Sequence, residues 1–251
     1  MRQTLGVLDG GRMRVVKFCR AIHNPGLSGT GLQVCALSVY RTSDNAFIRD
    51  PSEGVIGNVL HPSRPVSYTG DQVGAAFGGG ISGNGTIHIS GAAIKLVRPI
   101  PDAYIFCTSL VDVPLAETAR SLGYNSWYVI SDVDEFAKQI AHEIANSLGP
   151  RMQVAMFHGQ VSYHQEKSIR HMTIEGLAAS QKSLDPRLYF LKSHSPEDDA
   201  AKVFTDEREY RFVFVPVGAD GRTAPIPTPC LRLDAGAVRH LLEGAADAGD
   251  A

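Results

Sequence analysis

The sequence lacks the features that mark a membrane protein, a secreted disulfide scaffold or a zinc domain. Among its 251 residues, no apolar run reaches the length that a transmembrane helix requires. The segment Met1 to Val7 lacks the apolar region of a secretory signal. The chain has four widely scattered cysteines: Cys19, Cys35, Cys107 and Cys230. Because they show no CxxC or Cys/His spacing, we expect no metal site and no oxidised framework. The expected location is cytoplasmic, with no membrane partner.

A strong net charge is also missing, since the formal charge is −2. No global charge therefore demands a nucleic-acid partner, although nucleic acid stays possible as a substrate. Residues 1–100 hold 10 lysines and arginines against 5 acidic residues, whereas residues 101–251 hold 14 against 21. The two halves either neutralise each other within one fold or border a cleft for an anionic ligand.

The composition is that of an ordinary globular protein, with 43% hydrophobic and 20% charged residues. We predict one α+β domain over residues 1–243, built on a mixed, mainly antiparallel sheet with flanking helices, and a disordered tail over 244–251. The predicted strands cover residues 12–19, 32–37, 104–110, 127–130, 152–164 and 204–216. Of these, 152–164 is either one long, bent strand or two strands broken at Gly159. Helices are predicted over 115–122, 131–148 and 235–242, and polar helical structure over 166–203. Residues 41–85 show little periodicity, which predicts an irregular, functional or mobile stretch.

The clearest helix signal runs from Ser131 to Leu148. Phe136, Ile140 and Ile144 form one apolar stripe at helical spacing. Ser131 with Asp134 resembles a capping box at its start. Elsewhere, Asn84-Gly85 between alternating apolar residues predicts a tight hairpin rather than a phosphate loop.

The most informative segment is Phe204 to Pro216, which contains Glu207, Glu209 and Arg211. Its aromatic and β-branched residues predict a strand, so these three side chains share one face. Two neighbouring carboxylates repel each other, because like charges raise each other's pKa. Either Arg211 neutralises them in a structural network, or they meet a substrate.

Two other segments carry candidate binding groups. Tyr40-Arg41 is followed by Arg49, whose guanidinium matches a phosphate or a carboxylate. Arg49 could equally pin its own loop through Asp50 or Glu53. Thr108 and Ser109 end an apolar strand, where their hydroxyls either support a catalytic glutamate or cap the next turn.

Histidines and lysines in the second half give weaker signals. His158, His164, His171 and His194 match no metal-ligand spacing and are expected at the surface. Lys192 and Lys202 precede the Glu-rich strand, an arrangement similar to a metal-dependent nuclease. The nuclease order ends in Glu-x-Lys, however, whereas this strand reads Glu207-Arg-Glu209.

Several short motifs together resemble a bacterial domain-of-unknown-function family found in mobile and variable gene contexts. The matching landmarks lie at Gly31, Tyr40-Arg41, Arg49 to Gly54, Phe106 to Ser109, Val161 to Tyr163, and Phe204 to Arg211. That family carries no settled activity, so the resemblance implies ancestry rather than chemistry.

The order of an early arginine, Thr108-Ser109 and Glu207-Arg-Glu209 also resembles ADP-ribosyltransferases, which split a β-rich core around NAD. The resemblance implies that Arg41 or Arg49 holds the NAD phosphates and that the Ser/Thr strand supports the glutamate. Glu209 would stabilise the ribosyl cation as nicotinamide leaves. The implied site residues are Glu209, Glu207 and Ser109 for catalysis, and Arg41, Arg49, Tyr40, Thr108 and Arg211 for NAD.

Three functions follow as expectations from these observations. The first is an NAD-consuming ADP-ribosyltransferase-like enzyme acting as a toxin or anti-phage defence effector, with NAD as the consumed substrate. The second is a metal-dependent nuclease. The third is a non-catalytic ligand-binding or sensor module with a buried Glu207, Glu209 and Arg211 network. The sequence points to no particular acceptor and to no oligomeric state.

Overall fold

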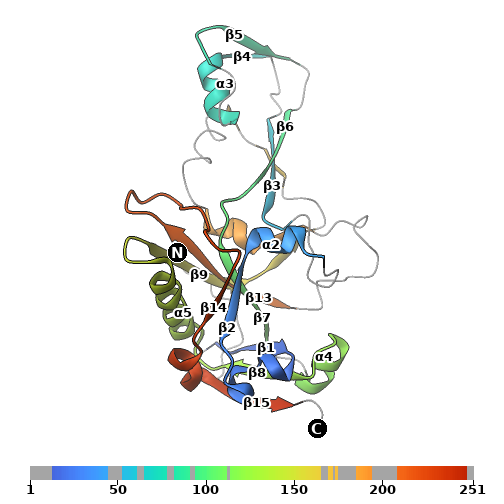
Figure 1. The fold of residues 1–251 in the computed structure, drawn as a ribbon. Coiled ribbons are helices and arrows are strands. Elements are labelled where there is room, and N and C mark those ends of the chain that lie inside the picture. Colours follow the sequence, from blue (N-terminus) through green and yellow to red (C-terminus); the bar gives the residue numbers. More distant parts are fainter. Residues whose placement is uncertain are drawn as a thin grey trace. The chain divides into compact units, whose positions relative to one another are not determined.

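The computed structural model describes residues 13–44, 53–60, 65–77, 82–90, 94–111, 114–164, 169–171, 173–174, 185–193 and 208–247. They form helices and mainly antiparallel strands, which confirms the predicted α+β class (Figure 1). The chain divides into two compact units. Unit 1 comprises Met1–Pro51, Asp102–Ser162 and Ala201–Ala251, and unit 2 comprises Ser52–Pro101 and Tyr163–Ala200. The single domain over residues 1–243 stays a prediction.

Within the described residues, unit 1 is built on an eight-stranded antiparallel sheet. Its strands are β1 (Val15–Cys19), β2 (Leu32–Ala36), β7 (Tyr104–Leu110), β8 (Ser126–Ile130), β9 (Gln153–Gln160), β13 (Glu209–Val217), β14 (Cys230–Leu233) and β15 (Leu242–Asp247). Residues 152–164 form two strands, as one of the two alternatives predicted, but the break lies at Val161 instead of Gly159, because β10 (Ser162–His164) pairs with another strand, β12 (Leu191–Ser193).

The sheet forks at β7. One edge of β7 pairs with β13 along most of its length, and β13 pairs in turn with β9. The other edge pairs with two strands that diverge: β2 at the start of β7, through Ala36 opposite Tyr104, and β1 at its end, through Val16 opposite Ser109. Lys17 lies in this fork, where its ammonium donates to the Cys107 carbonyl at 2.7 Å and stands 5.0 Å from the centre of the Phe106 ring.

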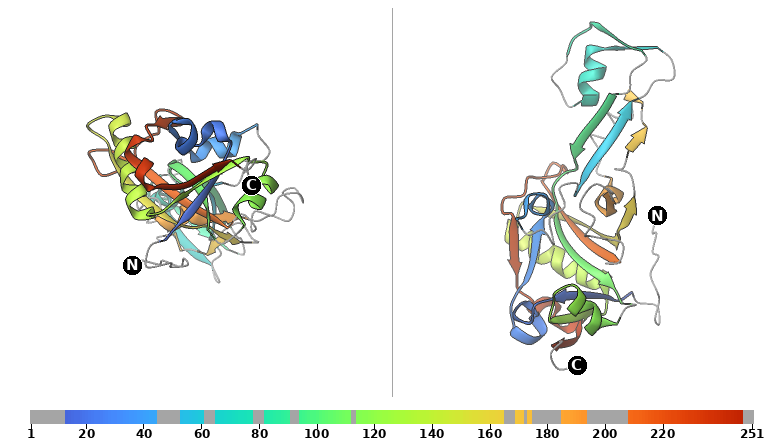
Figure 2. Two further views of the ribbon diagram at one scale, coloured as in Figure 1. Left: turned by 90° about the horizontal axis from the view of Figure 1, so that it is seen from below. Right: turned by 90° about the vertical axis from the view of Figure 1, so that its right-hand side faces the viewer.

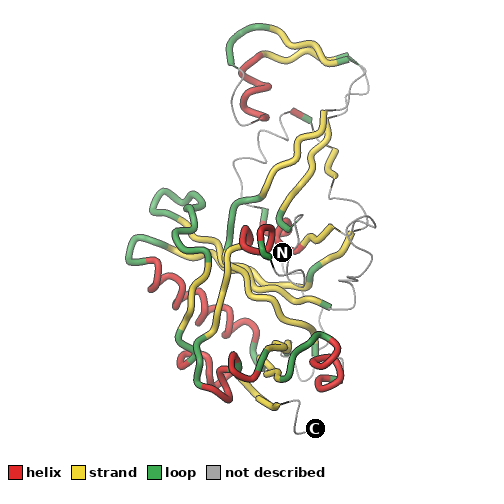
Figure 3. The backbone as a smooth tube through the Cα atoms, turned by 45° about the vertical axis from the view of Figure 1, so that its right-hand side comes forward, coloured by secondary structure: helices red, strands yellow, loops and turns green. Residues whose placement is uncertain are grey.

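Helix α5 (Val133–Leu148) packs on one face of the forked sheet, as its predicted apolar stripe requires (Figure 3). Phe136, Ile140 and Ile144 are buried, and each contributes about 1.5–3 kcal/mol of hydrophobic stabilisation. The predicted Ser131–Asp134 capping box is wrong, because Asp132 is the N-cap and accepts from the backbone N–H of Glu135. An aspartate one residue further along takes the position that the helix start needs.

The remaining helices of unit 1 are short. They are η1 (Ala21–His23), α1 (Pro25–Ser28), α2 (Leu37–Thr42), α4 (Leu115–Ser121) and η4 (Gly236–Leu241). Helix α4 covers the face of β1 and β8 that points away from α5, around Val16, Phe18 and Trp127 (Figure 2). The predicted helix over 235–242 is a 3-10 helix, followed by β15, which pairs with β8. A strand therefore replaces the predicted disordered tail up to Asp247, and residues 248–251 lie outside the described chain.

In its described residues, unit 2 contains three small groups of strands. Strand β3 (Val55–Leu60) lies between antiparallel β6 (Ile94–Pro99) and parallel β11 (Ile169–His171). Strand β4 (Val66–Thr69) pairs with β5 (Thr86–Ile89), and α3 (Gly70–Phe77) lies between them in sequence. Helix η2 (Pro186–Phe190) precedes β12.

These elements correct two predictions. The stretch 41–85, predicted to be irregular, contains strands and a helix, and the hairpin predicted at Asn84-Gly85 joins β5 to β4 through a connection that includes α3. The stretch 166–203, predicted to be largely helical, contains two short strands and a 3-10 helix in its described parts. In the described ranges, no helix has both the length and the apolar character needed to cross a bilayer.

Candidate functional site

Two of the predicted site residues lie side by side on the central strand pair. The register of β7 and β13 places Ser109 opposite Glu209 and Cys107 opposite Arg211. Directly opposed side chains in an antiparallel pair lie within contact reach of each other. Because residues two apart share a face, Cys107, Ser109, Glu209 and Arg211 form a four-residue block on the face turned away from α5.

Glu209 and Arg211 form a buried ion pair within this block. The guanidinium Nε and Nη2 both donate to Glu209 Oε1, at 2.9 and 2.8 Å. Glu209 is 3% exposed and Arg211 is 1% exposed. A carboxylate removed from water to this degree depends on its cationic partner, because an uncompensated buried charge is costly. This geometry corresponds to the structural interpretation of the Glu-rich strand that the sequence left open.

The alternating pattern on which the Glu-rich strand was predicted is interrupted at Arg208. Strand β13 begins at Glu209, five residues later than predicted, and Arg208 has a φ of 43°. A positive φ is costly for a residue with a side chain and turns the backbone out of the strand conformation. The shared face of Glu207 and Glu209 therefore does not follow from strand alternation. Glu207 itself lies outside the described residues.

Of the two predicted NAD-phosphate residues, Arg41 belongs to a helix that starts away from Ser109 and Glu209. Helix α2, which carries Tyr40 and Arg41, starts beside the beginning of β7, where Leu37 N–H donates to the Ala103 carbonyl at 2.8 Å. Ser109 lies at the other end of β7, about 17 Å away for five residues of extended strand. The structure thus does not bring Arg41 together with the central block, and Arg49 lies outside the described residues.

Thr108 also faces away from the block. It is buried, and its Oγ1 donates to the backbone carbonyl of Tyr210 at 2.8 Å. Its side chain therefore ties the two central strands together from the α5 side. Of the Ser/Thr pair, only Ser109 remains beside Glu209.

The sequence analysis missed a hydrogen-bonded triad near the same strands, formed by Tyr210, His158 and Asp134. His158 on β9 lies between Tyr210 and Asp134, with Nδ1 2.7 Å from the Tyr210 hydroxyl and Nε2 3.1 Å from Asp134 Oδ1. In a neutral ring, the carboxylate requires the proton on Nε2, so Nδ1 accepts from the tyrosine. Burial, and secondly the charge of Asp134, raise the pKa of Tyr210. The hydroxyl is therefore a neutral donor, which suits a structural link better than catalysis.

The sequence contained one signal from which part of this triad could have been predicted. Alternation along 204–216 puts Tyr210 and Phe212 on one face, and His158 pairs with Phe212 across the sheet. The rings of His158 and Phe212 have centroids 5.8 Å apart. The expectation of a surface histidine is therefore wrong for His158, whose side chain is 20% exposed. Strand pairing, which the sequence does not reveal, was the missing information.

In unit 2, Lys192, one of the two lysines of the nuclease interpretation, pairs with Glu53. Their Nζ and Oε2 atoms are 3.8 Å apart, and both residues are buried. The alternative that Arg49 pins its loop through Asp50 or Glu53 stays a prediction, because Arg49 and Asp50 lie outside the described residues. Within the described part of the chain, no three His, Cys, Asp or Glu side chains gather as a metal site would require. Lys202 and Glu207 lie outside that part, so the nuclease stays a prediction.

Cys19 on β1 has a buried thiol, and burial raises its pKa to about 11 against the opposing effects of the Lys17 charge and a Ser126 hydrogen bond. The unfolded thiol ionises near its ordinary value of 9.0. The part of the folding stability that depends on a neutral Cys19 thiol is therefore complete below pH 9, and it is lost as the pH rises towards 11. We expect the wild type to lose about 2 kcal/mol more stability than Cys19→Ala across this interval. Urea unfolding at a series of pH values measures the difference, and parallel curves would contradict it.

Comparisons with known proteins add no assignment to this geometry. No protein-family model, no curated protein and no solved structure matches the chain.

Proposed function

We propose that the chain is a non-catalytic ligand-binding or sensor module whose central strands are fastened by the Glu209–Arg211 ion pair. The supporting observation is the burial of both partners, with two guanidinium hydrogen bonds on one carboxylate oxygen. A catalytic carboxylate needs access to its substrate, whereas this one is buried and paired with a neighbour on its own strand. The separation of Arg41 from the block by most of the length of β7 supports the same proposal.

The cytoplasmic location and the bacterial domain-of-unknown-function ancestry enter as parts of this proposal. Cysteines in a cytoplasm are normally reduced, and a disulfide there is usually transient or regulatory. The Cys35–Cys230 disulfide of this chain would then be a responsive element rather than a permanent staple. That property suits a sensor.

An ADP-ribosyltransferase-like enzyme is the second candidate, and the position of Ser109 opposite Glu209 favours it. A hydroxyl beside the glutamate is what that family resemblance implies. In this case, Arg211 would have to release Glu209 when NAD binds, because the carboxylate is occupied by the guanidinium. The toxin or anti-phage role belongs to this second candidate alone.

Labelled NAD incubated with the pure protein and cell lysate separates the two candidates. The sensor proposal predicts no nicotinamide release and no labelled product from the wild type. It also predicts that Glu209→Gln lowers the melting temperature, because a charged hydrogen bond to Arg211 is lost. Glu117→Gln on the exposed surface of α4 is the matched control and should melt like the wild type. Nicotinamide release that Glu209→Gln abolishes without changing the melting temperature would instead establish the enzyme.

A further inference from the structure

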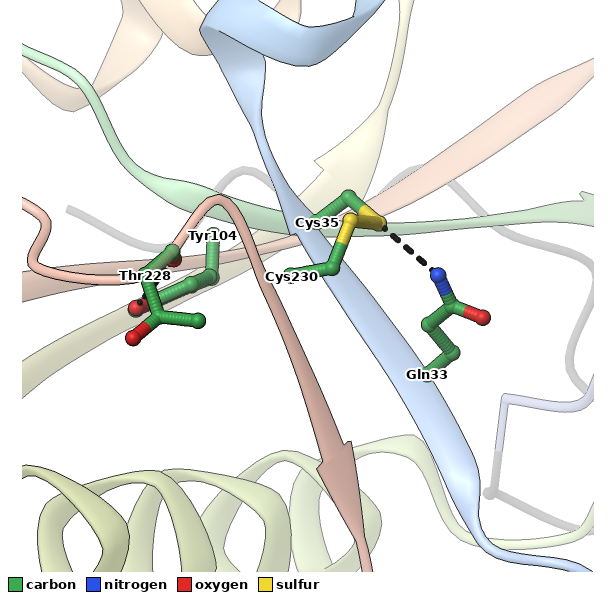
Figure 4. The surroundings of a disulfide bond; sticks show 5 residues. All are labelled: Gln33, Cys35, Tyr104, Thr228 and Cys230. Carbon is green, nitrogen blue, oxygen red and sulfur yellow. Dashed lines mark hydrogen bonds between the residues drawn. A yellow bond between two sulfur atoms is a disulfide. The ribbon is translucent and has the colours of Figure 1, made fainter.

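The outer face of β2 and β14 carries a disulfide with an asymmetric environment. Cys35 and Cys230 are directly opposed in the register and are joined through their sulfur atoms (Figure 4). Gln33 and Arg232 are the next opposed pair on the same face. Both cysteines are half-buried, and Gln33 and Arg232 are exposed. The disulfide therefore lies within reach of small solutes.

Gln33 distinguishes the two sulfur atoms. Its side-chain amide donates from Nε2 to Cys35 Sγ at 3.3 Å, and Figure 4 shows the amide nitrogen pointing to this sulfur. When a disulfide is cleaved by a thiolate, the sulfur that leaves takes up negative charge. A donor aimed at Cys35 stabilises that charge on Cys35, so cleavage favours Cys35 as the leaving group.

Arg232 adds a positive charge to the same block. It stands opposite Gln33 and two residues from Cys230 on β14. A guanidinium at this position attracts an anionic thiol to the Cys230 side of the disulfide. Both side chains thus favour the same cleavage. Arg232 attracts the thiol that attacks Cys230, and Gln33 stabilises the sulfur of Cys35 as it leaves.

We propose that Cys35–Cys230 is a thiol–disulfide exchange site for an anionic low-molecular-weight thiol, and that the thiol attacks Cys230 Sγ. The thiolate forms a mixed disulfide with Cys230 while the bond to Cys35 breaks and Cys35 leaves as a thiolate. A second thiolate then attacks the sulfur of the bound thiol and releases the Cys230 thiolate. Two thiols are oxidised to one disulfide, and the protein cystine takes up the two electrons as two thiolates, which protons from solvent neutralise.

Thiol–disulfide exchange removes the covalent link between β14 and β2. This strand is joined to β2 by only four residue pairs. The segment before it is fixed by hydrogen bonds, from Tyr104 to the Thr228 carbonyl and from Ala36 N–H to the Pro229 carbonyl. Reduction leaves these non-covalent contacts, together with the packing of Leu231 and Leu233 against the core, as the remaining attachment. We therefore expect faster amide deuterium exchange after reduction, with the largest increase over β14.

The test uses the full chain with millimolar reduced glutathione, quenched with acid at intervals and read by peptide mass spectrometry. The expected intermediate carries glutathione on Cys230, with Cys35 free. Gln33→Leu replaces the amide with an apolar side chain that has no donor and should slow the cleavage by about threefold to tenfold. Arg232→Gln should slow cleavage by glutathione more than cleavage by 2-mercaptoethanol, because the 2-mercaptoethanol thiolate lacks the additional carboxylates of glutathione.

Three results would overturn the proposal: glutathione mainly on Cys35, a Gln33→Leu rate equal to the wild-type rate, or a disulfide that resists millimolar thiol in the folded protein. Each readout is independent of any ligand or NAD, so the outcome does not depend on the proposed function.

Discussion

Replacing Arg211 with alanine is expected to lower the free energy of unfolding by about 3–5 kcal/mol, the usual cost of removing one partner from a buried ion pair. Glu209 would keep its charge at 3% exposure and lose both guanidinium hydrogen bonds. Its alternatives are to bind a proton or to admit water, and both disturb the central strands. Many domains have only about 5–15 kcal/mol of stability in total. At the lower end of this range, the expected loss is enough to leave part of the protein unfolded at room temperature. Urea unfolding followed by circular dichroism measures the loss.

Two further variants decide what the loss means. Arg222→Ala breaks an exposed pair with Asp220, whose closest charged atoms are 3.9 Å apart, and should change stability by less than about 1 kcal/mol. The double variant Glu209→Leu with Arg211→Met removes both charges and should recover much of the stability that Arg211→Ala loses. A stable Arg211→Ala protein would contradict the structural role of the pair and reopen the case for a substrate-facing Glu209.

Local sequence patterns predicted the elements whose burial they determine. The stripe of Phe136, Ile140 and Ile144 predicted α5 because an apolar face at helical spacing has to be covered. The apolar run from Tyr104 predicted β7 with its observed bounds, because the strand is buried over most of its length and so begins as a continuous hydrophobic segment. Both elements are largely determined by their own residues.

Elements that depend on distant partners were predicted poorly. Strand β11 pairs in parallel with β3, more than a hundred positions earlier in the chain, and neither segment shows a strong pattern of its own. The disulfide is the same kind of case, because 195 positions separate its cysteines. Their opposition follows from β14 returning to pair with β2, and no local spacing encodes that return. The expectation that no cysteines pair is therefore wrong for Cys35 and Cys230.

The candidate site shows the same difference between what local patterns predict and what depends on the pairing of distant segments. Ser109 and Glu209 were predicted to come together, and they do, since the two strands that carry them are neighbours. Arg41 was grouped with them from the order of motifs alone. Order along the chain does not give position along a strand, and the register places α2 at the opposite end of β7. The ion pair itself was one of two alternatives, and choosing between them needed the burial of Glu209 and Arg211.

The double variant Cys35→Ala, Cys230→Ala should be about 4–5 kcal/mol less stable than the oxidised wild type. The reason lies mainly in the unfolded chain, where a cross-link between positions 195 residues apart removes a large part of the conformational freedom. The closed loop includes all of unit 2 and the strands β7, β8, β9 and β13 of unit 1. Equilibrium urea unfolding under non-reducing conditions measures the difference.

Reducing agent supplies the control for this variant. It should move the wild-type midpoint to that of the alanine variant and leave the variant itself unchanged. A cross-linked unfolded chain is more compact and exposes less surface, so the wild-type urea dependence should steepen on reduction. An unchanged slope together with a large loss of stability would place the effect in the folded state, in the packing of β14 on β2. A loss below about 1 kcal/mol would mean that the non-covalent contacts of β14 are sufficient to keep it in the sheet. Reduction of the disulfide would then change the exposure of this edge without unfolding the protein.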